Sequence, residues 1–426
     1  MELHIELIPA QMPMAVTFVE TVTKAAGMPE AETGMLVLSA EELFMTLCNS
    51  MPGVTITLRC RDRRHAVDML LQIPQAPPDL RIFNITARLD HDSDQGLEQM
   101  GLYLASRACD QFGIRQLPMG GWEIMLRKER RYPAQSADTV PLPVSPANLL
   151  LTTTPAPEAV KQLSLLIAQQ YAAFQFPEQF TPCGRLLDKL ASDVYGVVLA
   201  HTENGIVAGG LLWRTDGERI VECFGPYLNV SEGHEQLSTL LCEKAVEQFG
   251  RSNRLGLVLY APQRPPASAG FEEAGSLTTP SGSIWTGYCM LAEEFGAAAS
   301  VPDALRPWYQ EFCSSMALAR QVHCYHDNGE GGDGLTLFAA RLDRGTGMAR
   351  LTPLLVGRDA AAVLAAHLEL LESDGFSSVY CCLDTGHPFD ALLAPYLLQQ
   401  GFTPCLLVPW GGSGDLIHLV RNGSRQ

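Results

Sequence analysis

Glycines between Asp94 and Arg131 have the spacing that most directly suits ligand chemistry in this chain. Gly96 and Gly101 are predicted to form a turn that leads into an apolar helix. Backbone N–H groups point outward at the start of a helix, so such a turn can bind an anion. The alternative is an ordinary helix that packs on the hairpin predicted after it. Spacing alone leaves both interpretations open.

Carboxylates and histidines supply further candidates for acid–base chemistry. Glu41 and Glu42 interrupt the apolar surface of a helix predicted from Pro29 to Cys48, either as a functional pair or as an exposed patch. The other candidates form no constellation by their spacing, and a lone histidine in an apolar run is more often structural. These candidates are Glu222, His323, His387, Tyr396 and His418.

The elements that would position the first group alternate between strands and helices. A strand is predicted over residues 3–7, helices over 14–26 and 29–48, and a hairpin over 56–73. The glycine turn, its helix and a second hairpin follow. Together with Gly101-Leu102-Tyr103-Leu104 and Asp110, this order resembles the ATP-binding domain shared by histidine kinases and anti-sigma-factor serine kinases (the GHKL type). The resemblance implies a two-layer α/β sandwich over residues 1–131.

The resemblance also implies roles for individual residues. Glu42 stands where the family has its catalytic Glu, and Thr46, one helical turn later, stands where an Asn holds Mg²⁺ between the phosphates of ATP. Thr46 would therefore be the metal ligand, with Asn49 available one turn later. The remaining ATP-binding positions are Gly96, Gly101 and Leu102.

One departure from the family weakens this ATP site. A D-x-G motif, whose carboxylate accepts from the adenine amino group, normally follows the first hairpin, but the segment from Ile73 to Asp79 contains none. A buried polar group left unpaired costs about 1–3 kcal/mol. The sequence thus predicts a domain that kept its fold and lost much of its ATP and Mg²⁺ chemistry.

A proline-rich linker is predicted over residues 132–148, because Pro133, Pro141, Pro143 and Pro146 favour a semi-extended chain. Residues 149–295 then read as a strand, two helices, three strands, a helix and a strand that leads to Gly270-Phe271. This order resembles the acetyl-CoA-dependent N-acetyltransferase (GNAT) family. The resemblance places the pyrophosphate of acetyl-CoA on a loop that contains Gly233, beside the unfavourable charges of Glu232 and Glu235.

The remaining residues, 296–426, repeat this pattern. Gly401-Phe402 matches Gly270-Phe271, and a helix predicted over residues 359–373 matches the one near residue 240. The predicted fold class is therefore α+β: a two-layer α/β sandwich, the linker, and a tandem pair of GNAT-like mixed α/β domains.

Composition limits the functional classes. The formal net charge of −17 disfavours nucleic acids and anionic membranes as partners, and no apolar run is long enough to span a bilayer. The 12 cysteines are scattered among apolar residues without any C-x-x-C pair, which indicates a reducing, cytoplasmic protein without a disulfide framework.

The hypothesis favoured by these patterns is a regulatory protein whose kinase-like domain binds a protein partner, such as a sigma factor or an antagonist of an anti-sigma factor. A homodimer is compatible with it. Two alternatives are an acetyl-CoA-dependent N-acetyltransferase with a regulatory domain, and an ATP-dependent serine/threonine kinase of the anti-sigma type.

Overall fold

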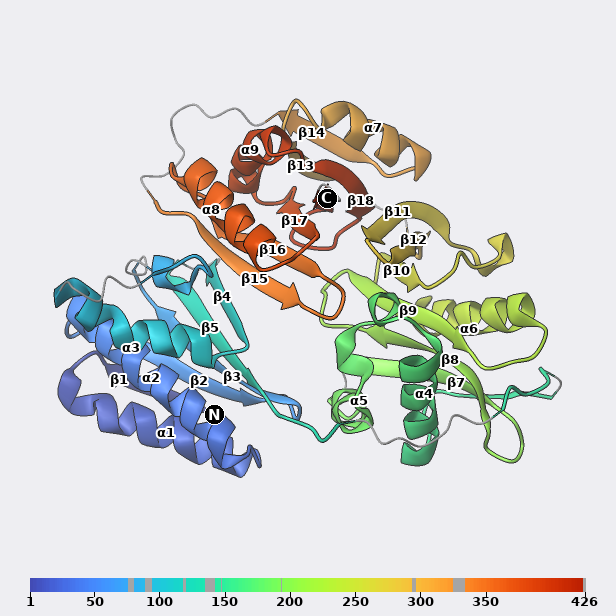
Figure 1. Cartoon of the computed structure of the whole chain (residues 1–426), viewed down its shortest axis with the longest axis horizontal. Coiled ribbons are helices and arrows are strands. Elements are labelled where there is room, and N and C mark those ends of the chain that lie inside the picture. The colour runs from blue at the N-terminus through green and yellow to red at the C-terminus, as the bar shows by residue number, and fades with distance from the viewer. Residues whose placement is uncertain are drawn as a thin grey trace. The chain divides into compact units, whose positions relative to one another are not determined.

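The structure, a computed structural model, describes residues 1–75, 80–88, 94–117, 120–134, 142–146, 148–192, 194–292, 296–324 and 334–423; of residues 94–99 and 324 it describes the backbone only. The chain is a mixed α/β protein that divides into two units (Figure 1). The first comprises 1–131, 331–341 and 351–370, and the second comprises 132–330, 342–350 and 371–426.

A five-stranded antiparallel sheet forms the base of the first unit, in the order β1-β2-β3-β5-β4. Apolar residues alternate along its strands, so that one face of the sheet is continuously apolar. The strands are β1 (Glu2–Glu6), β2 (Thr55–Asp62), β3 (Ala66–Ile73), β4 (Gln111–Gln116) and β5 (Trp122–Glu129).

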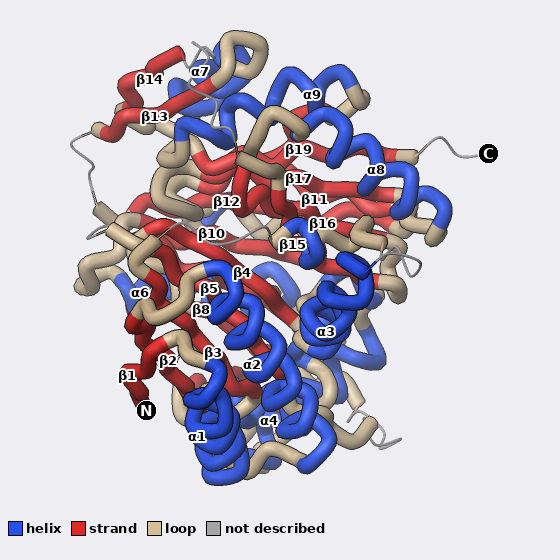
Figure 2. Tube along the Cα trace, turned by 90° about the vertical axis from the view of Figure 1, so that its left-hand side faces the viewer, coloured by secondary structure: helices blue, strands red, loops and turns tan. Residues whose placement is uncertain are grey.

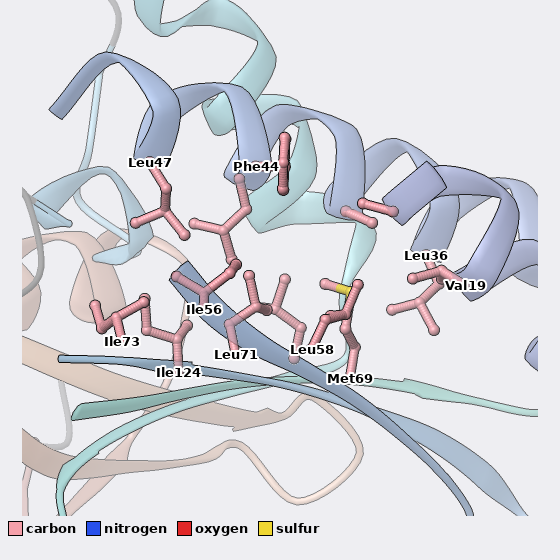
Figure 3. Close-up of a cluster of buried hydrophobic side chains, with 14 of the residues drawn as sticks. Val19, Leu36, Phe44, Leu47, Ile56, Leu58, Met69, Leu71, Ile73 and Ile124 are labelled. Atoms are coloured by element: carbon pink, nitrogen blue, oxygen red, sulfur yellow. The ribbon is translucent and has the colours of Figure 1, made fainter. Parts of the chain in front are cut away.

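Three helices cover that apolar face: α1 (Met12–Ala25), α2 (Glu30–Ser50) and α3 (Asp94–Ala108). Phe44 and Leu47 of α2 lie above Ile56 and Leu71 of the sheet (Figure 3). All four side chains are buried, and burying a side chain of this size stabilises the fold by roughly 1.5–3 kcal/mol. The predicted helices and hairpins of residues 1–131 are thus present as elements.

The predicted glycine turn is wrong. Helix α3 begins at Asp94, so Gly96 and Gly101 lie within the helix and not in a turn before it. Gly113 lies in β4. The reason is that α3 packs closely on α2, and that contact favours a small residue at position 101.

Buried Asn84 attaches a segment from the far end of the sequence to the first unit. Its side-chain amide donates to the carbonyl oxygen of Thr336 at 3.1 Å and accepts from the N–H of Phe338 at 2.9 Å. It therefore pairs with the backbone as a neighbouring strand would. The ring of Phe338 lies 5.2 Å from that of His367, and Leu337 joins the core of the first unit.

In the second unit, strands run in the order β17-β19-β18-β11-β12-β10-β9-β8-β7-β6. Figure 2 shows strands in red and helices in blue. The elements up to residue 290 are β6 (Leu150–Thr152), α4 (Pro157–Gln170), α5 (Cys183–Leu190), β7 (Tyr195–His201), β8 (Val207–Arg214), β9 (Ile220–Leu228), α6 (His234–Phe249), β10 (Gly256–Ala261), β11 (Glu272–Thr279) and β12 (Gly282–Met290).

The later elements are β13 (Ala297–Val301), α7 (Arg306–Ser315), β14 (Arg320–Cys324), β15 (Leu337–Asp343), β16 (Met348–Leu355), α8 (Ala360–Ser373), β17 (Ser378–Asp384), η6 (Pro388–Leu393), α9 (Ala394–Gln399), β18 (Thr403–Val408) and β19 (Leu416–Asn422). Strands β15 and β16 contribute residues to both units. A short 3-10 helix, η5 (Ala267–Ala269), stands before Gly270, whereas η6 and α9 precede Gly401.

The two faces of β7–β10 are covered by different helices. Val160, Leu163 and Leu166 of α4 pack on one face, next to Phe224 of β9. Leu237 and Leu241 of α6 pack on the other. Because side chains alternate along a strand, Glu222 shares the face of Phe224 and not that of Cys223.

Replacing Asn84 by alanine tests the attachment of residues 336–338. The variant Asn84→Ala leaves a buried carbonyl oxygen and a buried N–H group without their partners, so we expect it to lower the free energy of unfolding by roughly 2–4 kcal/mol. Asn49→Ala, at the exposed end of α2, is the matched control and should change little. Denaturant unfolding followed by tryptophan fluorescence measures both, and equal stabilities would contradict the assignment.

Candidate functional site

A β-bulge in β9 creates the most distinctive irregularity of the second unit. Gly210 pairs with Tyr227 and Leu212 with Phe224, so β9 contains one more residue than β8 across this step. On its other side, β9 pairs in parallel with β10 from Ile220 to Phe224, and the partner of Phe224 is Tyr260. Beyond Phe224, β9 therefore continues to Leu228 without a described partner in β10.

Polar side chains gather where this parallel pairing ends. Glu222 lies directly across from Arg214 of β8, and the two side chains form an ion pair. The second oxygen of Glu222, Oε1, lies 3.4 Å from the hydroxyl of Tyr260. The ring of Tyr260 stacks on Phe224, with centroids 5.4 Å apart, which holds the hydroxyl over the carboxylate. We call Arg214, Glu222 and Tyr260 the β9–β10 site.

The surroundings fix the charge of two of these groups. Burial disfavours the charged guanidinium of Arg214, but Glu222 and Asp216 outweigh it and raise the pKa of Arg214 overall. Burial, and then the charge of Glu222, raise the pKa of Tyr260 above its ordinary value. Tyr260 is consequently a protonated hydrogen-bond donor at neutral pH, and it can give a proton to a developing anion.

Gly233 lies at the start of α6, as its assignment to a cofactor loop requires. It is the N-cap of the helix, with φ +70°, a conformation that glycine adopts without strain. The side chain of Pro146 covers it: a Cβ atom at position 233 would lie 2.7 Å from Cγ of Pro146. Exposed Glu232 and Glu235 flank the helix start.

These contacts decide how well acetyl-CoA fits. The acyl end fits, since a proton donor and a carboxylate lie together at an interrupted strand pair. The pyrophosphate end fits less well, because two carboxylates flank the N–H groups of α6 and Pro146 covers Gly233.

The predicted ATP site in the first unit is filled by protein. Gly101 faces Glu42 so closely that a Cβ atom there would lie 1.7 Å from Oε2 of Glu42. One turn earlier in α2, the hydroxyl of Ser39 donates to the carbonyl oxygen of Ala105 at 3.2 Å. Helices α2 and α3 are thus in direct contact where a nucleotide would need room. Burial, and then Glu41, raise the pKa of Glu42.

The remaining residues assigned to ATP do not complete the site. The hydroxyl of Thr46 donates to the carbonyl oxygen of Glu42 at 2.8 Å, Asn49 is exposed near the end of α2, and Leu102 is buried in the core. Asp79 lies outside the described residues, and of Gly96 only the backbone is described. In the described part of the chain, no group of three or more His, Cys, Asp or Glu side chains could hold a metal ion. These residues do not fit ATP and Mg²⁺.

Asp110 has a structural role. Its Oδ2 accepts from the N–H of Glu129 at 2.7 Å and its Oδ1 accepts from Lys128 at 3.2 Å. It fastens the end of α3 to β5.

Asp384, His387 and Ser413 resemble a hydrolase triad in their residue types. Ser413 lies 2.8 Å from Nε2 of His387, and Nδ1 of His387 lies 3.7 Å from Asp384. Asp384, however, also accepts from the Ser413 hydroxyl and from the N–H groups of Gly386, Ser413 and Gly414. The groups that would attack a substrate and stabilise an oxyanion are thereby engaged, so this cluster fastens the loop between β18 and β19.

His418, a further acid–base candidate, is buried in β19. Its Nδ1 lies 3.3 Å from Sγ of buried Cys382. Burial, assisted by Arg350, lowers the pKa of His418 to about 3, so the ring is neutral at physiological pH. His323 is exposed in β14, and Tyr396 lies in α9 at the limit of exposure. None of the described cysteines forms a disulfide.

Only Glu222 among the predicted acid–base candidates gains partners suited to catalysis. Sequence reasoning missed Arg214 and Tyr260. Arg214 could have been found from the turn-forming residues Thr215-Asp216-Gly217 that follow it, because a hairpin sets two residues opposite each other. Tyr260 had no such local signal, because its strand β10 pairs with β9 only after the chain has passed through α6.

Comparison with known proteins finds similarity only at the level of structure. No protein-family model and no curated protein match the chain. A protein from Desulfovibrio desulfuricans described as a GNAT-family acetyltransferase matches at 16% identity, covering 34% of this chain and 99% of its own, with a TM-score of 0.28. Aminoglycoside 6'-acetyltransferase type Ii matches at 14% identity, with coverages of 34% and 99% and a TM-score of 0.27.

A protein from Salmonella typhimurium described as an acetyltransferase, solved with acetyl-CoA, matches at 14% identity. It covers 34% of this chain and 96% of its own, with a TM-score of 0.29. The structures matched over this third of the chain are thus acetyltransferase folds. Because the TM-scores lie below 0.5, these matches carry no weight for function. No described helix is long and apolar enough to cross a bilayer.

The buried carboxyl group of Asp390, in η6, makes the stability of the folded protein depend on pH. It accepts from the N–H of Asp384 at 3.0 Å, and burial raises its pKa to about 7. The folded protein therefore binds this proton more tightly than the unfolded chain, and stability falls as the pH rises from about 4 to about 7. Asp390→Asn should remove this loss of stability, so that the free energy of unfolding at pH 8 rises by on the order of 2 kcal/mol. Thermal unfolding of both proteins at pH 5 and pH 8 measures this, and a gain that is equal at the two pH values would contradict the assignment.

Proposed function

We propose that residues 149–290 form an acyltransferase unit of the GNAT type, which moves an acyl group from a thioester such as acetyl-CoA to an amine. The observation that carries this proposal is the end of the β9–β10 pairing at Phe224 and Tyr260, with Glu222 and Tyr260 in contact at that point. Beyond Phe224, β9 has no described partner in β10, and the hydroxyl of Tyr171 accepts from the N–H of Leu228 at 2.7 Å, so an extended ligand at the end of β9 would lie beside Tyr171. Glu222 and Tyr260 supply the proton transfers.

Glu222 and Tyr260 have opposite roles in proton transfer. Glu222 accepts a proton from the amine as the new C–N bond forms, and Arg214 keeps the carboxylate in place. Tyr260 is protonated before the reaction, and it gives its proton to the sulfur as the C–S bond breaks. The products are an amide and a free thiol, and a proton passed from Glu222 to Tyr260, 3.4 Å away, restores both groups.

The first unit supports no kinase chemistry in this proposal, since Glu42 lies against Gly101 between α2 and α3. Its contact with residues 336–338 through Asn84 favours a scaffolding role within the chain. A protein partner of the sigma-factor or antagonist type, a homodimer and a cytoplasmic location stay predictions.

Substitutions in the β9–β10 site test the proposal. With acetyl-CoA and a panel of primary amines, thiol release followed by a colorimetric thiol reagent should fall roughly 100-fold in Glu222→Gln and in Tyr260→Phe. Glu218→Gln, in the exposed turn before β9, is the matched control and should keep full activity. If both site variants release thiol as fast as the wild type, the proposed roles are wrong.

The acidic residues at the start of α6 give a second prediction. Replacing both Glu232 and Glu235 by glutamine removes two charges that repel a pyrophosphate, so the dissociation constant of coenzyme A should fall roughly three- to tenfold. Isothermal titration calorimetry measures it. Because the repulsion is electrostatic, the gain should shrink in high salt. A weaker or unchanged affinity at low salt would contradict placement of the pyrophosphate at α6.

A further inference from the structure

The second repeat, residues 296–426, contributes an arginine to the surroundings of the β9–β10 site. Arg350 lies in β16, in the part of that strand that belongs to the second unit. Strand β16 is the neighbour of β17 in the sheet. Arg350 is exposed, so its guanidinium can meet a ligand that arrives from solution.

The strands next to β16 carry polar side chains on one face, and this face contacts the first repeat. Cys382 of β17 pairs with His418 of β19. Tyr380 lies on the same face as Cys382, because side chains two positions apart in a strand point the same way. Its hydroxyl donates to the carbonyl oxygen of Thr278 in β11. Strand β11 belongs to the first repeat, where β11, β12 and β10 are successive neighbours in the sheet.

The positive charge of Arg350 acts on side chains of both repeats. In the second repeat, burial raises the pKa of buried tyrosine and cysteine side chains, and Arg350 opposes that rise. These side chains are Tyr380, Cys382 and Cys405. In the first repeat, burial and then Glu222 raise the pKa of Tyr260, and Arg350 opposes that rise as well. The guanidinium therefore lies near the hydroxyl of Tyr260.

No acidic side chain of the described residues neutralises this guanidinium. The side chain of Arg350 forms neither an ion pair nor a hydrogen bond with any residue that the structure describes. The chain has 47 Asp and Glu residues against 30 Lys and Arg residues, so a shortage of carboxylates does not explain the missing partner. Glu222, the carboxylate of the site, pairs with Arg214 instead. The charge of Arg350 is thus available to an anionic group of a ligand.

The two faces of the sheet show which ligand supplies that anion. Tyr260 stacks on Phe224, on the face that α4 covers. Helix α6 packs on the opposite face. A pyrophosphate at the start of α6 would therefore lie across the sheet from Arg350, whereas the amine that attacks the thioester approaches Glu222 and Tyr260 on the face near Arg350. The anion beside Arg350 belongs to the acyl acceptor.

We propose that Arg350 binds a carboxylate of the acyl acceptor, so that the substrate is a small amine that carries a carboxylate, such as an amino acid. This inference rests on the proposed function and names its substrate class. A guanidinium binds a carboxylate through two parallel hydrogen bonds. With the carboxylate at Arg350 and the amine at Glu222, the products of the reaction are an N-acyl amino acid and a free thiol.

Matched acceptors test the proposal in the full chain. Glycine, β-alanine and γ-aminobutyrate are each compared with the corresponding amide, which keeps the amine and lacks the negative charge. Thiol release from acetyl-CoA is measured, with rates referred to the unprotonated amine. We expect kcat/KM of the wild type to be roughly tenfold to a hundredfold higher for the acid than for the amide in the pair whose length fits the site.

Substitutions of the arginine assign that preference to its charge. Arg350→Gln should lose the preference through a higher KM for the acid, and Arg350→Lys, which keeps the charge, should retain part of it. Arg350→Glu should favour the amide. Arg344→Gln is the matched control and should keep the preference, because Arg344 lies in the turn of the same hairpin and pairs with Asp374 at 3.2 Å.

The outcomes separate the two proposals. If the wild type acetylates each acid and its amide with equal kcat/KM, or if Arg350→Gln keeps the full preference, the assignment of Arg350 is overturned and the acyltransferase proposal stays intact. If no acceptor releases thiol from acetyl-CoA in the wild type, the acyltransferase proposal fails, and the assignment of Arg350 fails with it.

Discussion

One additional residue in β9 is the constraint on which the functional unit depends. The bulge between Phe224 and Tyr227 lets β9 keep its antiparallel pairing with β8, and its parallel pairing with β10 reaches only as far as Phe224. Beyond Phe224, the outward-facing N–H of Leu228 donates to the hydroxyl of Tyr171 and not to β10. The contact of Glu222 with Tyr260 and the start of α6 both follow from this position in the strand.

Local sequence patterns predicted many of the helices and strands. They missed contacts between side chains on strands that are far apart in the sequence. The three consecutive strands and the following helix predicted within residues 149–295 appear as β7, β8, β9 and α6, because alternation and amphipathicity act over a few residues. Tyr260 meets Glu222 only after a crossover through α6, and Val144 meets Val230 across 86 positions of sequence. No spacing encodes such pairs.

The glycine at position 101 shows how the same residue type serves different purposes. A glycine before a helix suits an anion, which was the expectation, but Gly101 lies inside α3 and lets the carboxylate of Glu42 approach the helix backbone. The predicted helices and hairpins of residues 1–131 are present, and the resemblance to the kinase-type ATPase domain stays a prediction. In the second unit, the β9–β10 site brings a proton donor and a carboxylate together, whereas acidic residues and Pro146 lie at the start of α6.

A crystal structure of the full chain with a non-transferable thioether analogue of acetyl-CoA would test the central claim most directly. The account predicts the sulfur beside the hydroxyl of Tyr260, at the end of the β9–β10 pairing, with the amide arm beside the end of β9. A saturated crystal in which the analogue is absent from the end of β9 would contradict it.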